Sequence, residues 1–171
     1  MLLYLFRHGI AIDRTHPDCP SESERFLTER GQRSTHRAAR GLRHLRVRPD
    51  LVLTSPYVRA RETAEIVLRE LDLAPMRLHV REDLLPMSPP ESVLAALPEL
   101  HEQDVMLVGH APHLDALLAE AVGHDDPYLS SLTKAGAACI EFDDSSCRRG
   151  TLLWLIPSRG LRAMGRGSTL A

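Results

Sequence analysis

Short apolar runs that stop at polar residues or glycine recur along the chain. The run 2–6 ends at Arg7-His8-Gly9, and the run 105–108 ends at Gly109-His110. A short continuous run of this kind is typical of a buried strand that ends at a loop. The predicted strands are 2–6, 51–53, 77–80, 105–108, 137–142 and 151–156.

Between these runs, apolar residues recur at the spacing of helices. Thr28 has the side chain of an N-cap, and Ser55 is expected to cap a second helix whose first turn contains Pro56. The predicted helices are 29–45, 57–71, 91–100 and 112–122. In the first of them, the positions expected to face the core are Ala38, Leu42 and Leu45.

This alternation of strands and helices predicts an α/β fold, in which ligands bind at the carboxyl ends of the strands. The last two strands, joined by the polar stretch 143–150, predict a hairpin with one strand antiparallel to the main sheet. A length of 171 residues predicts a single domain spanning 1–171. We expect 11–26 to be a loop that covers or borders the site, and 157–171 to be frayed.

Composition excludes several classes of protein. Apolar residues make up 43% of the chain, charged residues 26%, and the formal net charge of −2 favours neither a nucleic-acid nor a membrane partner. The three cysteines form no C-x-x-C pair, which fits a reducing compartment. The opening apolar run is too short for a signal peptide, and no run reaches the roughly 18 residues of a membrane span. We therefore expect a cytoplasmic protein.

Cationic side chains fall at two kinds of place. Along the first predicted helix, a stripe is formed by Arg33, Arg37, Arg40 and His44. The stripe is either a solvated helix face or a docking surface for an acidic partner.

The other cations follow strands. Arg7 and His8 come directly after the first strand, Gly9 allows a tight turn there, Arg59 lies at a helix start, and His110 follows a later strand. Helix starts favour anions, and a guanidinium beside an imidazole suits a phosphate. Arg-His-Gly alone is a weak signal, and Arg59 alone could be a surface residue of a charged helix. Two histidines and two arginines in such positions favour a phosphate site.

Four motifs occur in an order that resembles the histidine phosphatase superfamily, also called phosphoglycerate-mutase-like. They are Arg7-His8-Gly9, Leu27-Thr28-Glu29-Arg30-Gly31, Ser55-Pro56-Tyr57-Val58-Arg59-Ala60 and Gly109-His110-Ala111-Pro112. The short chain, without an insertion after Arg59, is most similar to the bacterial SixA-type phosphohistidine phosphatases. The resemblance implies a three-layer α/β/α sandwich with a mostly parallel sheet.

The resemblance also implies a mechanism. His8 would be the nucleophile and form a phosphohistidine intermediate, and the phosphate pocket would be lined by Arg7, Gly9, Arg59 and His110. No metal and no organic cofactor are implied. The two arginines can supply the positive charge that Mg²⁺ otherwise brings to a phosphoryl group, and a protonated His110 would add a third positive contact.

One position departs from the larger members of the superfamily, which carry a glutamate there as proton donor. Our alignment places Pro86 at that position, as in SixA-type proteins, with Glu82 and Asp83 as nearby substitutes. A missing acid is tolerable when the leaving group is an imidazole that already carries its proton. An alkoxide leaving group would suffer much more.

The sequence therefore predicts a metal-independent phosphatase that acts on phosphohistidine of a partner protein. A phosphatase of a small phosphate monoester or nucleotide is a second hypothesis. A phosphate-binding module without catalysis is a third, although binding alone would not need His8.

Overall fold

The strands of the protein form one six-stranded sheet. The computed structural model describes residues 1–124, 126, 131–143, 147 and 149–166. The strands are β1 (Leu2–Arg7), β2 (Leu51–Thr54), β3 (Leu78–Val80), β4 (Asp104–Gly109), β5 (Ala137–Glu141) and β6 (Thr151–Ile156). Their order is β3-β2-β4-β1-β5-β6, with parallel pairing from β3 to β1. β5 runs antiparallel to both of its neighbours, which confirms the predicted hairpin and its place in the sheet.

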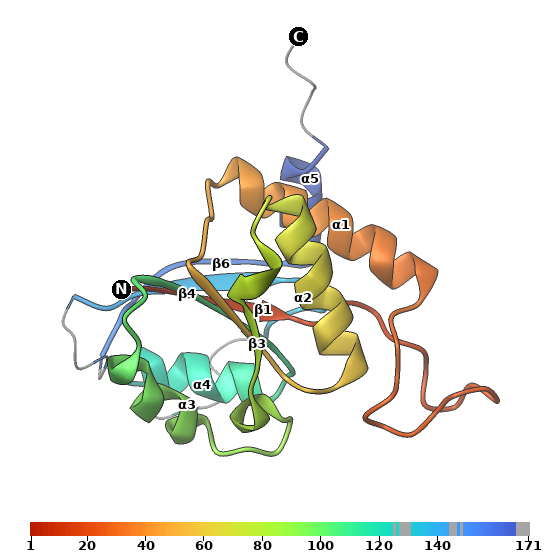
Figure 1. Cartoon of the computed structure of the whole chain (residues 1–171), viewed down its shortest axis with the longest axis horizontal. Helices are drawn as coiled ribbons and strands as arrows, with labels where there is room; N and C mark the ends of the chain where they lie inside the picture. Colours follow the sequence, from red (N-terminus) through yellow and green to blue (C-terminus); the bar gives the residue numbers. More distant parts are fainter. Residues whose placement is uncertain (125, 127–130, 144–146, 148, 167–171) are drawn as a thin grey trace, which may run out of the picture.

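Helices cover both faces of this sheet, so the fold has the three layers that the resemblance implied (Figure 1). One face carries α1 (Glu29–His44), α2 (Val58–Glu70) and α5 (Ser158–Met164), and the other carries α3 (Pro90–Ala96) and α4 (His113–Ala121). Three short 3₁₀ turns complete the described elements, at Pro75–Arg77, Glu82–Leu84 and Leu97–Glu99. Among the described residues, no helix is both long and apolar enough to cross a bilayer.

The central strands are apolar throughout because alternate side chains enter two different cores. In β1, Leu3 and Leu5 pack toward α3 and α4, whereas Tyr4 and Phe6 pack toward α1, α2 and α5. β4 divides its side chains in the same way. The continuous apolar runs of the sequence therefore reflect burial on both faces.

Two details of the predicted helices are wrong. Thr28 does cap α1, since its hydroxyl accepts the N–H of Gly31 at 3.0 Å. Leu45, however, is 36% exposed because α1 ends at His44 and the chain turns away from the core. α2 begins only at Val58, so Ser55 does not cap it and is available for another contact.

The end of the chain also differs from the prediction. Residues 158–164, expected to fray, form α5, whose Leu161 is fully buried in the core beside α1. Gly41 of α1 allows this contact, because a Cβ there would collide with the backbone of Leu161. Residues 167–171 lie outside the described part, as do 144–146 and 148 of the predicted turn 143–150.

Strand register places the ends of β1, β4 and β2 side by side. Arg7 pairs with Gly109, and Thr54 pairs with Val108. Just past these pairs, the His8 N–H donates to the Gly109 carbonyl at 2.9 Å, and the Ser55 N–H donates to the Val108 carbonyl at 3.1 Å. The residues that follow the three strands therefore meet at one edge of the sheet.

Candidate active site

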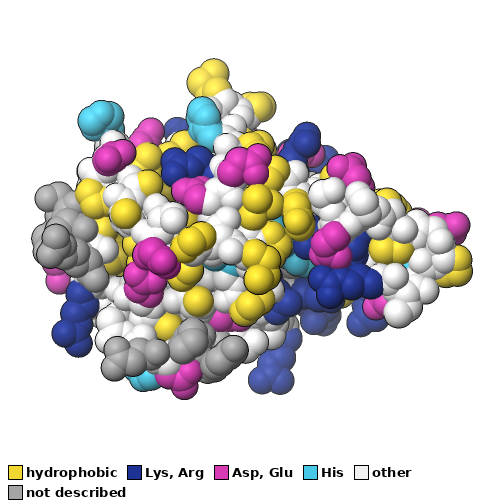
Figure 2. Space-filling view, turned by 90° about the horizontal axis from the view of Figure 1, so that it is seen from below, with side chains coloured by type: hydrophobic (Ala, Val, Ile, Leu, Met, Phe, Trp, Pro, Cys, Tyr) yellow, Lys and Arg dark blue, Asp and Glu magenta, His cyan; other side chains and the backbone are white. Residues whose placement is uncertain are grey.

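A cavity of about 660 Å³ opens at this edge of the sheet. The loop 11–26 forms one wall, which confirms the expectation that it borders the site. The lining residues are Arg7, His8, Asp13, Arg14, Thr15, Glu22, Arg25, Tyr57, Arg59, Pro86, Met87, His110, Ala111 and Lys134. Figure 2 shows Lys and Arg side chains gathered at the base of this projecting loop.

The hydrogen bonds of His8 determine which of its ring nitrogens carries the proton. Nδ1 lies 2.7 Å from the carbonyl oxygen of Gly9. Because a carbonyl can only accept, Nδ1 must carry the hydrogen, and neutral His8 keeps its lone pair on Nε2. The Nε–H of Arg59 points at that lone pair from 3.3 Å. His8 is thus held in the tautomer that a nucleophile requires.

The surroundings of His8 also keep it uncharged. Burial lowers its pKa to about 3, helped by the positive charges of Arg59 and Arg7 and opposed by the hydrogen bond to Gly9. The imidazole is therefore neutral at any pH above about 4, and its Nε2 lone pair accepts the Nε–H of Arg59.

His110 is neutral for a similar reason. Burial lowers its pKa to about 2, and neighbouring His8 and Arg59 add to the shift. In the free protein His110 is therefore a hydrogen-bonding group, and the third positive contact considered from the sequence would require a bound anion to raise this pKa.

Ser55 orients His110. The serine Oγ lies 2.8 Å from His110 Nε2 and accepts the N–H of Tyr57 at 3.4 Å, which leaves its own hydrogen free to donate to the imidazole. In the arrangement in which Ser55 donates this hydrogen to Nε2, the proton of neutral His110 lies on Nδ1. Tyr57 packs edge-on against the same ring, at 5.3 Å between centroids. Ser55 does not cap α2, and its hydroxyl positions the His110 ring instead.

Two buried polar atoms of the cavity have no partner among the described residues. They are Arg7 Nε and His110 Nδ1. Arg7 is anchored at its other end, where Nη1 donates to the carbonyl of Leu132 at 2.6 Å. Arg7 Nε–H is a buried donor, and His110 Nδ1 is a second one when Ser55 donates to His110 Nε2. Because buried donors are nearly always satisfied in native structures, this pair predicts a ligand with acceptor oxygens, such as a phosphate.

Arg59 is a buried cation, only 3% exposed, and Glu22 provides its counter-charge. Arg59 Nη1 donates to the Glu22 carbonyl at 2.6 Å, and Nη2 donates to the Glu22 carboxylate at 2.8 Å. Its guanidinium also lies over the ring of Tyr57, 4.9 Å from the centroid. The sequence placed Arg59 at a helix start, but the side chain is oriented by contacts that come from the loop 11–26.

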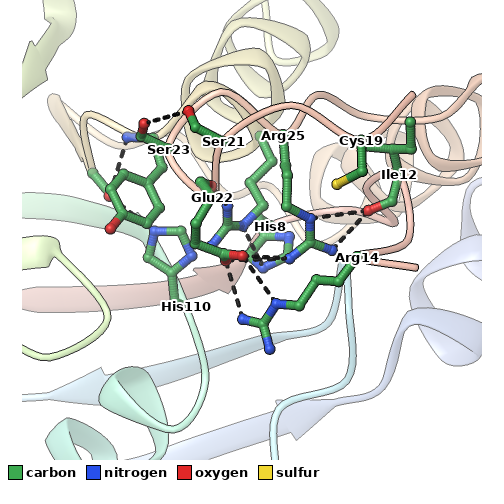
Figure 3. Close-up of polar contacts among 12 residues, drawn as sticks. His8, Ile12, Arg14, Cys19, Ser21, Glu22, Ser23, Arg25 and His110 are labelled. Atoms are coloured by element: carbon green, nitrogen blue, oxygen red, sulfur yellow. Dashed lines mark hydrogen bonds and ion pairs between the residues drawn. The ribbon is translucent and has the colours of Figure 1, made fainter. Parts of the chain in front are cut away.

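Glu22 is surrounded by arginines (Figure 3). Besides Arg59, its carboxylate contacts Arg14 at 2.9 Å and Arg25 at 3.1 Å. These partners hold the pKa of Glu22 near 2, with the bond to Arg14 the largest cause. The carboxylate is therefore a permanent negative charge beside His8, held by the kind of guanidinium cluster that also binds phosphate.

The structure brings together the four residues that sequence motifs predicted: Arg7, His8, Arg59 and His110 line one cavity. Gly9, which was grouped with them, does not line it. Its carbonyl orients His8, its N–H donates to Thr63 at 3.0 Å, and a Cβ would collide with Thr35. The close approach to α1 is a reason for glycine at this position besides the turn that the sequence predicts.

The two substitute acids lie away from this cavity, whereas Pro86 lines it. Asp83 forms an ion pair with Arg81 at 2.6 Å, and the carbonyl of Glu82 accepts from Ser88. The structure therefore gives no support to either residue as the proton donor.

Sequence reasoning assigned no role to several residues that line the cavity. They are Asp13, Arg14, Thr15, Glu22, Arg25, Tyr57, Met87, Ala111 and Lys134. Tyr57 was within reach because it lies inside the Ser55-Pro56-Tyr57-Val58-Arg59-Ala60 motif. The residues of the loop 11–26 show no periodic pattern of apolar positions. The only signal that could have indicated them is the high content of charged residues in a loop that was expected to border the site.

The charge of Glu22 leads to a first prediction. Replacing Glu22 by Gln keeps the acceptor oxygen and the backbone contact to Arg59 but removes the negative charge from the cavity. We expect inorganic phosphate to inhibit the Glu22→Gln protein with an inhibition constant about 10-fold lower than in the wild type, because a like charge nearby weakens anion binding. Glu24→Gln on the same loop is the matched control. Unchanged or weaker inhibition would show that Glu22 mainly positions Arg59.

Comparisons with known proteins agree with this geometry. A family model described as the histidine phosphatase superfamily (branch 1) matches residues 3–88. An uncharacterized protein of Picosynechococcus is 39% identical over 141 residues, covering 80% of this chain and 82% of that protein. Phosphohistidine phosphatase SixA of Escherichia coli is 31% identical over 157 residues, covering 90% of this chain and 92% of SixA.

Two solved structures share the fold of this chain. The protein histidine phosphatase SixA, complexed with tungstate, superposes with a TM-score of 0.83 at 29% identity and covers 94% of this chain and 99% of that one. The alpha-ribazole phosphatase of Shigella flexneri shares the fold with a TM-score of 0.71 at 21% identity, covering 92% of this chain and 97% of its own.

Proposed function

Because the chain belongs to the histidine phosphatase superfamily (branch 1) and is a phosphatase, we propose that it dephosphorylates phosphohistidine on a protein without a metal ion. The observation that carries this proposal is the neutral His8, whose Nε2 lone pair faces a cavity with buried N–H groups that have no partner. The likeness to SixA, named a phosphohistidine phosphatase, supports the choice of substrate.

The proposed reaction has two displacements at phosphorus. First, the lone pair of His8 Nε2 forms a bond to phosphorus, while the bond from phosphorus to the substrate imidazole breaks and leaves its electron pair on that imidazole. Second, a water oxygen attacks phosphorus and the bond to Nε2 breaks. His8 recovers its lone pair, inorganic phosphate leaves, and the surplus water proton passes to solvent.

Cationic and N–H groups of the cavity stabilise the charge on the phosphoryl oxygens during both steps. Arg7 Nε and His110 Nδ1 donate to these oxygens, which satisfies the two orphaned atoms. Arg59 exchanges its contact with His8 Nε2 for a phosphoryl oxygen, so the lone pair becomes free as the substrate arrives. The negative charge of Glu22 competes with the phosphoryl group for Arg59 until then.

Metal independence rests on the same cations. Arg7 and Arg59 place two permanent positive charges where a phosphoryl group would lie, and a planar guanidinium can hold two oxygens at once. Burial and the surrounding arginines do not remove this charge, because guanidinium groups stay protonated at any ordinary pH. The protein therefore needs no added Lewis acid for charge neutralisation.

A substrate panel tests the proposal. Purified protein is incubated with a phosphohistidine peptide, acetyl phosphate and a sugar phosphate, each with no added metal and again with excess EDTA. We expect turnover of the phosphohistidine peptide to be fastest and unchanged by EDTA. Loss of turnover in EDTA that one divalent ion restores would refute the metal-free mechanism, and a faster sugar phosphate would favour a small-molecule substrate.

A further inference from the structure

A second cavity, of about 560 Å³, lies between α1, α5 and the segment that precedes β5. We call it the arginine groove. Its lining residues are Ile10, Arg30, Arg33, Ser34, Arg37, Lys134, Ser158 and Arg162. Lys134 also lines the catalytic cavity, so the two cavities are neighbours that share one wall.

The cations of the groove are largely without counter-charges. Arg33 pairs with Glu29 at 3.1 Å in an exposed contact of the kind that contributes little stability. Within the described part of the chain, no ion pair joins a carboxylate to Arg30, Arg37, Lys134 or Arg162. A surface with this many unneutralised cations attracts anions, in a protein whose formal net charge is −2.

The groove corrects the arginine stripe that the sequence indicated. Arg33 and Arg37 belong to it, together with Arg30 and Arg162, which the stripe did not include. Arg40 instead pairs with Glu70 of α2 at 3.0 Å, and neither Arg40 nor His44 lines the groove. The part of α1 that remains available for an anion is therefore the part nearest the catalytic cavity.

The size of the groove indicates more than one anionic group. Arg30, Arg33 and Arg37 share a helix face, and seven residues of α-helix span about 10 Å, which is far wider than one phosphate. Separate carboxylates along a peptide match this spacing. A single second phosphate on a small substrate would leave most of the cations without a partner.

We propose that the arginine groove binds acidic side chains that flank the phosphohistidine of the protein substrate. The inference rests on the proposed function, because the groove would hold the chain while Lys134 marks the passage to the catalytic cavity. The enzyme then selects phosphohistidines in acidic surroundings. Charge complementarity of this kind acts mainly on association and on partner choice.

Two synthetic phosphohistidine peptides test the proposal, one flanked by four Glu and the other by four Gln. At low salt we expect the wild-type protein to hydrolyse the Glu peptide with a kcat/KM about 10-fold higher. The double variant Arg30→Gln/Arg37→Gln should reduce this preference to about threefold or less, and high salt should do the same in the wild type. Turnover of acetyl phosphate should be unchanged in the double variant.

Arg43→Gln/Arg48→Gln is the matched control, because it removes two exposed arginines from a different cavity at the far end of α1. It should keep the full preference for the Glu peptide. Equal kcat/KM for both peptides in the wild type, or equal loss in both double variants, would overturn the groove proposal.

A binding measurement separates this proposal from the proposed function. Fluorescently labelled peptides without phosphate are titrated with wild-type protein and with both double variants. Tighter binding of the Glu peptide, lost only in Arg30→Gln/Arg37→Gln, would support the groove even if no phosphohistidine were hydrolysed. Equal binding of the Glu and Gln peptides to wild-type protein would overturn it even if both phosphopeptides were good substrates.

Discussion

Replacing His8 by Ala should abolish phosphatase turnover, with a loss of at least about 10⁴-fold in kcat, while phosphate or vanadate still binds. Loss of a nucleophile removes the covalent route itself, whereas Arg7, Arg59 and His110 would still hold the anion. The measurement is the initial rate with a phosphohistidine peptide, together with a binding constant for vanadate. A nucleophile and a binding residue fail differently in this pair of measurements.

The pKa of His8 also predicts how wild-type activity depends on pH. Because burial lowers this pKa to about 3, its nucleophilic form is present throughout the ordinary pH range, and wild-type activity should not fall between pH 7 and 5 through protonation of His8. The control for His8→Ala is His101→Ala, which changes an exposed histidine outside the cavity and should keep full activity. Substantial turnover by His8→Ala would assign the nucleophile elsewhere, with His110 as the next candidate.

Leaving groups should differ strongly, because Pro86 lines the cavity. The resemblance implies a proton-donating glutamate at this position in larger members of the superfamily. A protonated phosphoimidazole leaves as neutral imidazole and needs no acid, whereas an alkoxide must be protonated as it leaves. A positioned acid typically contributes about 10² to 10⁴-fold. We expect phosphohistidine peptide to exceed an alkyl phosphate in kcat/KM by a factor of that order, with activated aryl phosphates in between.

The variant Pro86→Glu sharpens this test. It should raise the rate with the alkyl phosphate and leave the rate with phosphohistidine peptide almost unchanged. Met87→Glu is the matched control, because it adds the same charge one residue further along the cavity wall. The explanation fails if the wild type hydrolyses alkyl phosphates as fast as phosphohistidine and Glu82→Gln or Asp83→Asn abolishes that activity. Such a result would give the acid's role to a carboxylate that the structure places outside the cavity.

Most elements of the fold could be predicted because their signals are local. The central strands are apolar runs, since each strand is covered on both faces, and α1 begins directly after Thr28, whose hydroxyl accepts the free N–H of Gly31. Helix ends were less predictable. Leu45 continues the apolar period of α1, yet the helix has already ended there, and Ser55 resembles a cap while its hydroxyl serves His110.

The helix near the end of the chain, α5, could not be predicted from the sequence either, for a different reason. The stretch 157–171 has several Gly and Arg and only a weak apolar period, so its local pattern indicates fraying. α5 forms because Leu161 finds a buried place beside α1, where Gly41 leaves room for its backbone. Such short helices are stabilised mainly by tertiary packing, which no local pattern contains.

For the site, the sequence by itself determined which side chains lie at the carboxyl ends of the strands: Arg7 at the end of β1, His8 directly after it, and His110 directly after β4. Parallel pairing makes this placement nearly sufficient, because the carboxyl ends of neighbouring strands meet at one edge. Only the tertiary structure decided that Glu22 neutralises Arg59. It also decided that Arg30 lines the arginine groove and that Arg40 does not. A loop can reach many positions, and the charge that it brings to a cavity depends on contacts between segments far apart in sequence.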